Sequence, residues 1–357
     1  MRPTIADNVD AGMDKAHGHL HFVFVNSREE LVVAADPLTV QLVNLMDGTR
    51  TIRELTNAVR GRAQQKEVAR LVTFLCKNRV VVDATSLHAL PSSLLAFQRQ
   101  IQFFSDFSRN PAAIQKMLAK SNVGIVGLGT IGGMIASQLC RMGVGSITTV
   151  DPDNVSASNL ARHSLFTAAD VGESKVTATR RALKAVRPAL HYSGRQTVIC
   201  SEADIARFAS DCSLVINCAD QPSVAQTSEW VGCACMKTHT PHILAGGYRT
   251  HLGFLGPTVL PFKTACWKCF ADDYKKNDPF GKLGWKPLVS SRVSGGSIMP
   301  LAAIVASVHV WEAVRVLTGL LPPMLCNRKA EINYTDLGLT WYEVLRNPSC
   351  CICARHQ

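Results

Sequence analysis

A glycine-rich turn, GLGTIG, lies between a strand-like run and a helix-like run and constrains the fold of this chain more than any other feature. Its glycines, Gly127, Gly129 and Gly132, satisfy the spacing G-x-G-x-x-G directly after the apolar residues VGIV. Such a turn lets a strand pass into a helix and lets a phosphate group approach the backbone N–H groups at the helix N-terminus. The turn therefore predicts a nucleotide-binding strand–turn–helix unit.

The residues after this turn continue to alternate between strand-like and helix-like runs. SITTV, LHYSGRQTVI and CSLVINCAD are strand-like, and KVTATRRALKAVRP and IARFASD are helix-like. Apolar strands separated by amphipathic helices are typical of a parallel sheet that is covered on both faces. We therefore predict an α/β fold with a Rossmann-like, doubly wound and mostly parallel sheet over residues 121–357, connecting helices over 86–120 and a separate domain over 1–85.

Composition narrows the class of protein further. A chain of 357 residues that is 47% hydrophobic can bury a sizeable core in two or three domains. The net charge of +11 predicts attraction to nucleotides or to an acidic peptide, but no basic block indicates a nucleic-acid partner. The longest apolar run, residues 297–314, carries His309 and Glu312 and indicates a core helix rather than a membrane span. No signal sequence is evident, so we expect a cytoplasmic protein.

Polar residues beyond the second predicted strand favour a triphosphate over a dinucleotide. Asp151 ends that strand and can accept hydrogen bonds from ribose hydroxyls. Arg162 and Lys175 supply two cations near the phosphate turn. Asp220 ends the apolar run LVINCAD, where a carboxylate can bind a magnesium ion that also contacts phosphates. This pattern predicts a nucleoside triphosphate and Mg²⁺ as ligands.

The order of the motifs GLGTIG, DPDNVSASNLARH, GESK, CAD and CWKC resembles the ubiquitin-activating-type (ThiF/MoeB/HesA-like) adenylating enzymes. The resemblance covers about residues 95–355 and implies a homodimer that binds ATP. The residues that it implies for ATP binding are Gly127, Gly129, Thr130, Gly132, Asp151, Asp153, Ser158, Asn159, Arg162 and Lys175. The residues that it implies for catalysis are Arg99, Arg162, Lys175 and Asp220. In this family an arginine like Arg99 reaches the phosphates across the dimer interface, and an aspartate like Asp220 holds magnesium.

The chemistry that this resemblance implies is the activation of a carboxylate. A carboxylate oxygen attacks the α-phosphate of ATP, pyrophosphate leaves and an acyl adenylate forms. Arginine, lysine and magnesium can stabilise the negative charge that develops on the phosphate during this attack.

Two C-x-x-C pairs predict a structural zinc site. CWKC supplies Cys266 and Cys269, and CCIC supplies Cys350 and Cys353, with Cys351 as an alternative ligand. Four thiolates can fill a tetrahedral zinc site completely, even when many residues separate the pairs. The polar stretch at 270–296 predicts a long loop over the nucleotide site, and the lack of cysteine at 270–325 argues against a thioester relay through that region.

Residues 1–85 predict a small winged-helix-like α+β domain. Two strand-like runs, HLHFVFV and ELVVAAD, precede three short helices and the strand RVVVD. The stretch LVNLMDGTRTIRELTNAV, together with VTFLCKNRVVVD, resembles the PqqD-like peptide clamps that recognise leader peptides in ribosomal natural-product pathways. Such a clamp adds an extended peptide to a sheet edge. The resemblance therefore implies a precursor peptide as the partner of residues 1–85.

The combination of clamp and adenylating domain resembles the enzymes that modify ribosomally made peptides, including those of microcin and pantocin biosynthesis. It implies adenylation of a carboxylate, expected to be a glutamate side chain, followed by cyclisation with loss of water. Three alternatives stay open. One is an adenylyltransferase for the C-terminal glycine of a sulfur carrier, and another is an NAD(P)-dependent oxidoreductase. The third is a non-catalytic peptide-binding protein, which Thr130 and Gln221 keep open because this family usually has glycine and asparagine there.

Overall fold

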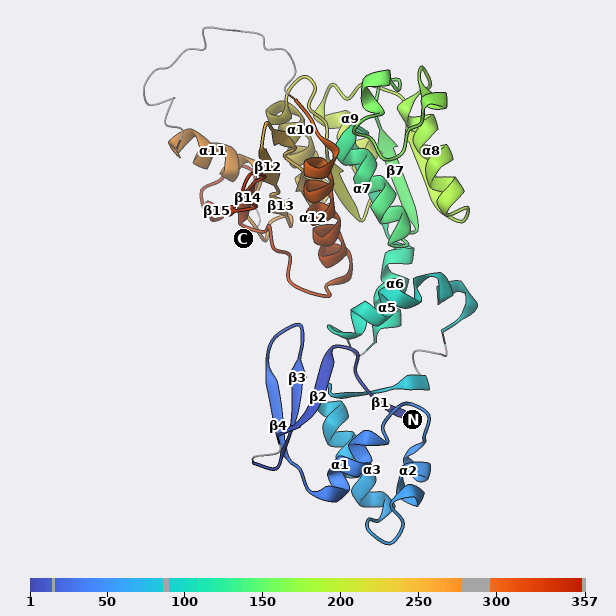
Figure 1. Cartoon of the computed structure of the whole chain (residues 1–357). Helices are drawn as coiled ribbons and strands as arrows, with labels where there is room; N and C mark the ends of the chain where they lie inside the picture. Colours follow the sequence, from blue (N-terminus) through green and yellow to red (C-terminus); the bar gives the residue numbers. More distant parts are fainter. Residues whose placement is uncertain (15–16, 86–89, 109, 278–295, 355–357) are drawn as a thin grey trace. The chain divides into compact units, whose positions relative to one another are not determined.

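The computed structural model describes residues 1–14, 17–85, 90–108, 110–277 and 296–354 (Figure 1). The chain divides into two compact units, Met1–Ala112 and Ala113–Gln357. Separate hydrophobic clusters lie within each unit, so each unit has its own core.

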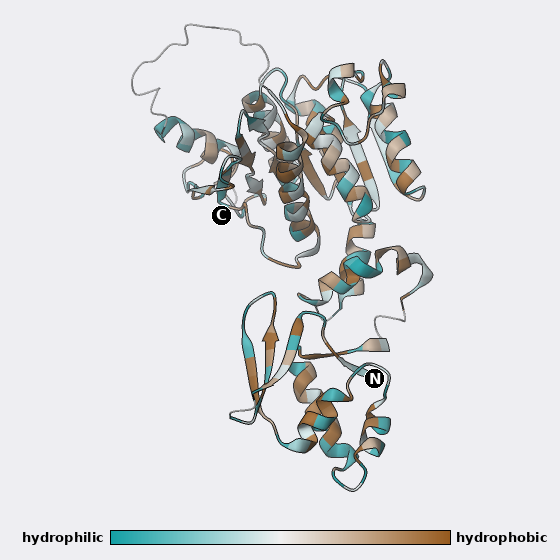
Figure 2. Cartoon of the chain, viewed as in Figure 1, coloured by the Kyte–Doolittle hydropathy of each residue, from teal (hydrophilic) through white to brown (hydrophobic). Residues whose placement is uncertain are grey.

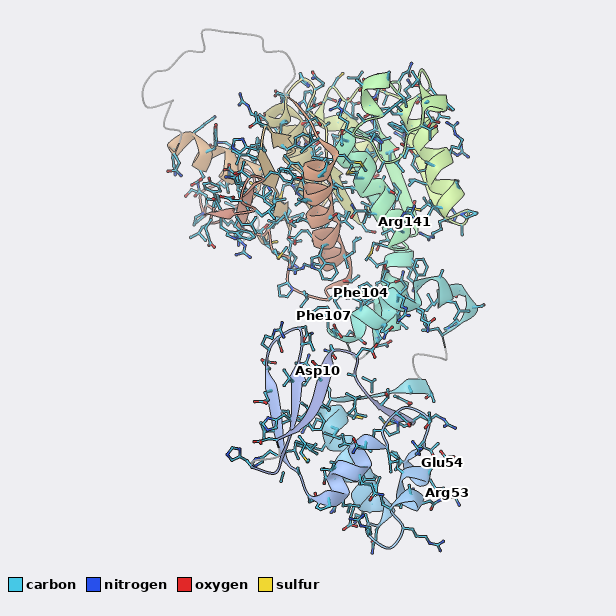
Figure 3. The ribbon with its side chains drawn as sticks, viewed as in Figure 1. Asp10, Arg53, Glu54, Phe104, Phe107 and Arg141 are labelled. Carbon is cyan, nitrogen blue, oxygen red and sulfur yellow. The ribbon has the colours of Figure 1, made fainter. Side chains whose placement is uncertain are left out.

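The first unit mixes strands and helices. In chain order its elements are β1 (Pro3–Ile5), β2 (Val9–Asp14), β3 (His19–Phe24), β4 (Glu30–Ala34), α1 (Pro37–Asn44), α2 (Ile52–Ala58), α3 (Gln65–Lys77), β5 (Val81–Asp83), the 3-10 helix η1 (Ser92–Phe97), α5 (Gln98–Ser105) and the start of α6 (Pro111–Lys120). Strands β2, β3 and β4 form an antiparallel sheet, and β1 pairs with β5. Phe104 of α5 is fully buried, and Figure 3 labels it together with Phe107.

Capping residues set where the helices of this unit begin. The Asp36 carboxylate accepts the backbone N–H groups of the first turn of α1. Thr51 and Glu54 form a reciprocal capping box at the start of α2 (Figure 3 labels Glu54). Such pairs satisfy two N–H groups that a helix cannot satisfy internally. These contacts explain why α1 and α2 begin where they do.

Two strands of this unit have no counterpart in the sequence-based prediction. Strand β1 lies in the polar stretch before Ala6, and β2 pairs with β3 along its whole length, from Val9 opposite Phe24 to Asp14 opposite His19. Val9, Ala11 and Met13 alternate with Asp10, Gly12 and Asp14 along β2, but of these six residues only Val9 is buried. Glycine and aspartate are uncommon in strands, so the conformation of β2 depends on its backbone pairing with β3.

The second unit is built around a parallel sheet. Its elements are β6 (Asn122–Val126), α7 (Thr130–Arg141), β7 (Ser146–Val150), the 3-10 turns η2 (Ala157–Asn159) and η3 (Ala168–Asp170), α8 (Lys175–Val186), β8 (His191–Arg195), α9 (Glu202–Ala209), β9 (Leu214–Asn217), α10 (Val224–Lys237), β10 (His242–Leu244), β11 (Tyr248–Arg249), β12 (Leu252–Leu255), β13 (Thr258–Val259), α11 (Trp267–Asn277), α12 (Met299–Thr318), β14 (Arg328–Asn333) and β15 (Leu339–Glu343).

The six-stranded sheet has the order β13-β10-β9-β6-β7-β8. Five of these strands are parallel, and β13 is antiparallel to β10, so the mostly parallel α/β sheet that the sequence predicts is confirmed. The chain proceeds from β6 to one side through β7 and β8, then crosses to the other side of β6 through β9 and β10. Right-handed crossovers then place α7 and α8 on one face and α9 and α10 on the other. The strand order reverses between β6 and β9, which is where doubly wound sheets bind ligands.

The segment after the first C-x-x-C pair is partly helical. The sequence predicts a loop for 270–296, but α11 continues to Asn277, so this prediction is wrong for its first eight residues. An ion pair between Lys268 and Asp272, one helical turn apart, supports the helix. Residues 278–295 of the predicted loop lie outside the described residues.

Helix α12 has the length and composition of a membrane-spanning helix, and within the described part of the chain no other helix does. In the structure it packs against α7 and β12 (Figures 1 and 2). His309 and Glu312 on this helix are fully buried. His309 accepts the Gly256 N–H through Nε2, at 2.9 Å. These are the contacts of a core helix that anchors loops of its own unit.

Glu312 provides a stability test for this packing. Its carboxylate accepts the hydroxyl of Thr258 at 2.9 Å and the backbone N–H groups of Met324 at 2.8 Å and Leu325 at 2.7 Å. Replacing one carboxylate oxygen with an amide NH₂ leaves a buried N–H facing another donor. Glu312→Gln should therefore lower the free energy of unfolding by about 2–4 kcal/mol, measured by urea denaturation. The exposed Glu343→Gln should change it by less than about 0.5 kcal/mol; equal effects would contradict the role assigned to Glu312.

Candidate functional site

A cavity of about 880 Å³ lies at the carboxyl edge of the parallel sheet. The loops after β6, β7, β8, β9 and β10 all contribute to its lining, so it occupies the position where the strand order reverses. The predicted site residues that line it are Gly127, Gly129, Thr130, Asp151, Asp153, Ser158, Asn159, Arg162, Lys175 and Asp220. The fold therefore brings together residues that lie far apart in the chain, from Gly127 to Asp220.

Two glycines explain how the turn after β6 can form. Gly127 has φ of +90°, and a Cβ there would lie 2.9 Å from the backbone N of Ala219 in the loop after β9. A Cβ on Gly132 would lie 2.0 Å from the carbonyl oxygen of Gly127. Gly132 thus lies beneath the turn and does not line the cavity, but only glycine fits there. The turn and the β9 loop are packed backbone to backbone.

Arg99 is the other predicted site residue that does not line the cavity. It belongs to the first unit, on α5, where its guanidinium donates to Gln102 Oε1 at 3.4 Å. Its role at the phosphates of a partner subunit stays a prediction.

The Asp151 carboxylate connects the loops after β6 and β7. It accepts the Leu128 N–H at 2.6 Å and the Asp153 N–H at 2.9 Å, and only 4% of the residue is exposed. Burial raises the pKa of Asp151, and the nearby Lys175 ammonium and the two N–H groups counteract that rise. Each carboxylate oxygen has room for more than one hydrogen bond, so Asp151 retains capacity to accept hydroxyl groups of a ligand.

Charged side chains around this cavity differ in whether they already have partners. Lys175 Nζ lies 2.7 Å from Asp153 Oδ2 and 3.8 Å from Asp151 Oδ1. Among the residues that the structure describes, Arg162 and Asp220 make no side-chain hydrogen bond or ion pair. An unpaired cation and an unpaired carboxylate in one cavity can each contact a charged ligand without first breaking an internal bond.

A short capping motif orders the loop after β7. Ser156 N–H donates to Asn159 Oδ1 at 3.1 Å, and the hydroxyls of Ser156 and Ser158 are 2.9 Å apart. This use of the Asn159 oxygen leaves its NH₂ group available as a donor. The loop thus presents hydroxyl and amide donors next to Arg162.

His163 is a buried residue of the cavity wall that the sequence motifs do not single out. Its ring stacks on Phe166 with centroids 3.7 Å apart. Nε2 lies 3.2 Å from the Leu128 carbonyl oxygen, and Nδ1 accepts the Leu165 N–H at 3.3 Å. These contacts require the neutral tautomer with hydrogen on Nε2. Burial lowers the pKa of His163 to about 4, and the nearby Lys175 and Arg162 charges act in the same direction.

The loops after β8 and β10 add residues that the motifs did not predict. Thr197, Val198 and Ile199 follow β8, and Tyr248 and Arg249 form β11, just beyond β10. Tyr248 and Arg249 could have been predicted from the stretch GGYRT, which has a glycine pair, an aromatic residue and a cation and closely follows the apolar run HIL. Such residues at the carboxyl end of a parallel strand are expected to face the ligand crevice.

A second cluster lies apart from this cavity and consists of four cysteines. Cys266, Cys269, Cys350 and Cys353 are all buried, and their sulfur atoms lie within 4.8 Å of one another. The sulfur–sulfur distances are 3.9 Å within the first pair, 3.6 Å from Cys266 to Cys350 and 3.6 Å from Cys269 to Cys353. Cys351 is exposed and lies outside the cluster. The sequence thus predicts correctly which thiols assemble.

Comparison with known sequences gives one family and several relatives. The model of the ThiF family matches residues 97–352. The molybdopterin-synthase adenylyltransferase of Escherichia coli is 27% identical over 245 residues, which are 68% of this chain and 90% of that protein. The sulfur carrier protein ThiS adenylyltransferase of E. coli is 28% identical over 211 residues, 58% of this chain and 77% of that protein.

Comparison with solved structures shows the same fold along nearly the whole chain. E. coli MccB with ATP has a TM-score of 0.75 at 20% identity, covering 99% of this chain and 100% of that one. The microcin C7 biosynthetic enzyme MccB in complex with N-formylated MccA has a TM-score of 0.76 at 19% identity, with the same coverage. PaaA has a TM-score of 0.72 at 20% identity, covering 96% of this chain and 100% of that one.

The buried neutral His163 predicts a loss of stability in mild acid. Its pKa is about 4 in the folded chain and 6.5 as the ordinary value, so the unfolded chain binds the proton more tightly. The stabilisation is complete above pH 6.5 and is lost as the pH falls towards 4, by about 3 kcal/mol in total. Urea denaturation at pH 7.5 and pH 5 measures this loss.

The variant His163→Gln isolates this contribution, because the amide can still donate to Leu128 but does not titrate. His242 and His309 have similarly lowered pKa values of about 4 and remain in both proteins. The variant should therefore lose less stability between pH 7.5 and pH 5 than the original chain. Identical losses would show that His163 is not the titrating group.

Proposed function

This chain belongs to the ThiF family, and from this premise we propose that it uses ATP to adenylate a carboxylate, expected to be a glutamate side chain, on a ribosomally made precursor peptide. Dehydration and cyclisation of the peptide follow, as in pantocin-like biosynthesis. The observation that carries the proposal is the assembly of the glycine turn, Arg162, Lys175 and Asp220 around one cavity.

The order of the strands suggests how ATP binds. The ribose hydroxyls meet Asp151 at the end of β7, and the phosphates lie over the glycine turn at the N-terminus of α7. Arg162, Lys175 and the Asn159 amide are donors to phosphate oxygens. Mg²⁺ binds few protein carboxylates and retains waters and phosphate oxygens as its other ligands, so Asp220, which has no partner among the described residues, fits it. Magnesium would screen phosphate charge there when bound.

The proposed reaction needs positioning and charge stabilisation rather than a base. A carboxylate oxygen of the peptide forms a bond to the α-phosphorus, and the bond to the bridging oxygen breaks. Pyrophosphate leaves with the electron pair, and no proton moves. Arg162 and Lys175 stabilise the charge on the equatorial oxygens. In the second step a nucleophile of the peptide attacks the acyl carbon, releases its proton and displaces AMP, so that the peptide has lost one water overall.

The first unit supports a peptide substrate. Strands β2 and β4 are the edges of its three-stranded sheet, and an edge strand offers backbone groups to an added strand. We assign leader recognition to residues 1–85 on this basis and on the fold shared with MccB, which has been crystallised with MccA. A cytoplasmic homodimer, in which Arg99 reaches the phosphates of its partner, completes the proposal.

Adenylation of the C-terminal glycine of a sulfur carrier is the second candidate, because one of the relatives is named a sulfur carrier protein ThiS adenylyltransferase. The family match starts at residue 97, so it leaves most of the first unit unexplained. The likeness to MccB includes that unit. This difference in coverage favours the peptide substrate.

The cysteine cluster fits a structural zinc ion. A tetrahedron with zinc–sulfur bonds of about 2.3 Å has sulfur–sulfur edges of about 3.8 Å. The observed distances of 3.6 to 3.9 Å agree with that value. Four buried thiolates would leave no open position, so zinc would join the C-terminal turn to the start of α11 and take no part in the reaction.

Turnover tests the proposed reaction. The purified chain with Mg²⁺ and ATP should release AMP and pyrophosphate with amidated peptides that carry an internal glutamate, and the peptide mass should fall by one water. AMP that stays attached to the peptide would indicate a microcin-like outcome instead. Activity only with a peptide that ends in a free Gly-Gly carboxylate would establish the sulfur-carrier alternative, and hydride transfer from a nicotinamide would establish an oxidoreductase.

The variant Asp220→Ala should lower kcat for AMP release by at least about 100-fold, because it removes the carboxylate that would hold Mg²⁺ at the reacting phosphates. Asp211→Ala is the matched control, since Asp211 is also exposed but precedes β9, at the opposite edge of the sheet. It should retain activity. Full activity of the Asp220 variant would exclude the assigned role.

The zinc assignment predicts about one zinc ion per chain by elemental analysis of the purified protein. Cys353→Ser should lose the metal and lower the melting temperature, because breaking a closed site exposes the remaining buried thiols. The adjacent Cys351→Ser should retain both metal and stability. Loss of zinc from the Cys351 variant would identify Cys351 as a ligand instead.

A further inference from the structure

Arg249 is a cation of the cavity that the proposed reaction has not used. It lies on β11, directly after β10, and Tyr248, Thr250 and Ser297 line the cavity next to it. Within residues 1–14, 17–85, 90–108, 110–277 and 296–354, its guanidinium makes no hydrogen bond or ion pair. By contrast, Lys175 is already paired with Asp153.

The strand order shows which side of the cavity Arg249 borders, and Arg249 itself lies on β11 of the separate sheet β11-β12-β14-β15. Asp151 follows β7, the glycine turn follows β6, Asp220 follows β9 and Arg249 follows β10, and these four strands are neighbours in this order. Adjacent strands are about 4.8 Å apart, so the end of β10 is about 14 Å from the end of β7. A nucleotide with its ribose at Asp151 and its phosphates over the turn leaves the β10 end for the second reactant.

The backbone around Arg249 is held in place by local contacts. Arg249 pairs with Leu252 across the short hairpin of β11 and β12. The Tyr248 hydroxyl hydrogen-bonds the Ser297 hydroxyl, which joins this hairpin to the segment before α12. Thr250 has φ of +55°, which a tight two-residue turn requires and which a β-branched residue adopts rarely. The hairpin thus presents Arg249 from a defined backbone.

The chemistry of the reaction requires a cation at this side. A peptide carboxylate must approach a triphosphate of the same charge, and Asp220 adds a further negative charge at the neighbouring strand end. An arginine offers two parallel N–H donors that match the geometry of a carboxylate, which orients the acid and offsets the repulsion.

We propose that Arg249 binds the reacting carboxylate of the acceptor and so restricts this site to acidic acceptors. The inference rests on the proposed function and names the group that holds its second substrate. One carboxylate oxygen accepts from the guanidinium while the other attacks the α-phosphorus and displaces pyrophosphate. No proton transfer is needed, which agrees with His163 having both ring nitrogens occupied by backbone groups.

The test uses ATP–pyrophosphate exchange by the full chain with a synthetic, N-acetylated and C-amidated peptide that contains one glutamate as its only acid. The same peptide with glutamine is the blank. Arg249→Gln should lower kcat/KM for the peptide by at least about 30-fold, while the affinity for the non-hydrolysable analogue AMPCPP changes less than twofold. Arg249→Lys should retain part of the activity, and millimolar guanidinium should partly restore Arg249→Gln.

The control is Arg180→Gln, because Arg180 is an exposed cation on α8 outside the cavity and its loss changes the net charge equally. It should stay within twofold of the original chain. Arg249→Gln with unchanged kcat/KM for the peptide would overturn the inference, as would an equal loss of AMPCPP affinity, which would make Arg249 a phosphate ligand. No exchange by the original chain with any acid would instead overturn the proposed function.

Discussion

The buried carboxylate of Asp151 is the interaction on which the geometry of the cavity depends. It joins the turn after β6 to the loop after β7 by accepting a backbone N–H from each, and it faces Lys175. A buried carboxylate is unfavourable unless donors and cations surround it, so the three partners have to be arranged together. Because one of these donors is Leu128, inside the glycine turn, the same contact that satisfies Asp151 fixes the turn over which the phosphates of the proposed ATP ligand would lie.

The other charged side chains of the cavity follow Asp151 along the carboxyl edge of the sheet, in the order of its strands. Lys175 forms an ion pair with Asp153, whereas Arg162 and Asp220 have no partner among the described residues. In the proposed complex a triphosphate would therefore compete with Asp153 for Lys175, whereas Arg162 would contact it without giving up another partner among the described residues. Arg249 is a further available cation on the far side of Asp220. In the proposed reaction the cavity would divide into a nucleotide side and an acceptor side, with the Asp220 carboxylate between Arg162 and Arg249.

The sequence predicts the features of the cavity and of the cysteine cluster that are local in the chain. A few consecutive residues are enough to interpret GLGTIG, Asp151 and each of the two C-x-x-C pairs. The backbone turn, the strand end and the ligand spacing that they indicate are local features of the chain. Arg249 and β2 are different. Arg249 reaches the site because β10 lies two strands from β6, and β2 is a strand because β3 pairs with it. Both depend on which segments become neighbours, and the neutral state of His163 depends likewise on backbone groups that only the fold assembles.

A cysteine that lines the cavity could in principle react with the acyl adenylate of the proposed reaction. Cys218 lines the cavity between β9 and Asp220, and burial raises its pKa to about 12. At neutral pH it is a thiol, and the thiol form is a poor nucleophile. An acyl adenylate formed here would therefore not be passed to Cys218 as a thioester. The acyl group would remain available to a nucleophile that the acceptor itself brings, and a tethered nucleophile reacts faster than one from solution because its approach is intramolecular. The unreactive thiol is therefore consistent with the cyclisation that we propose, in which the nucleophile belongs to the bound peptide.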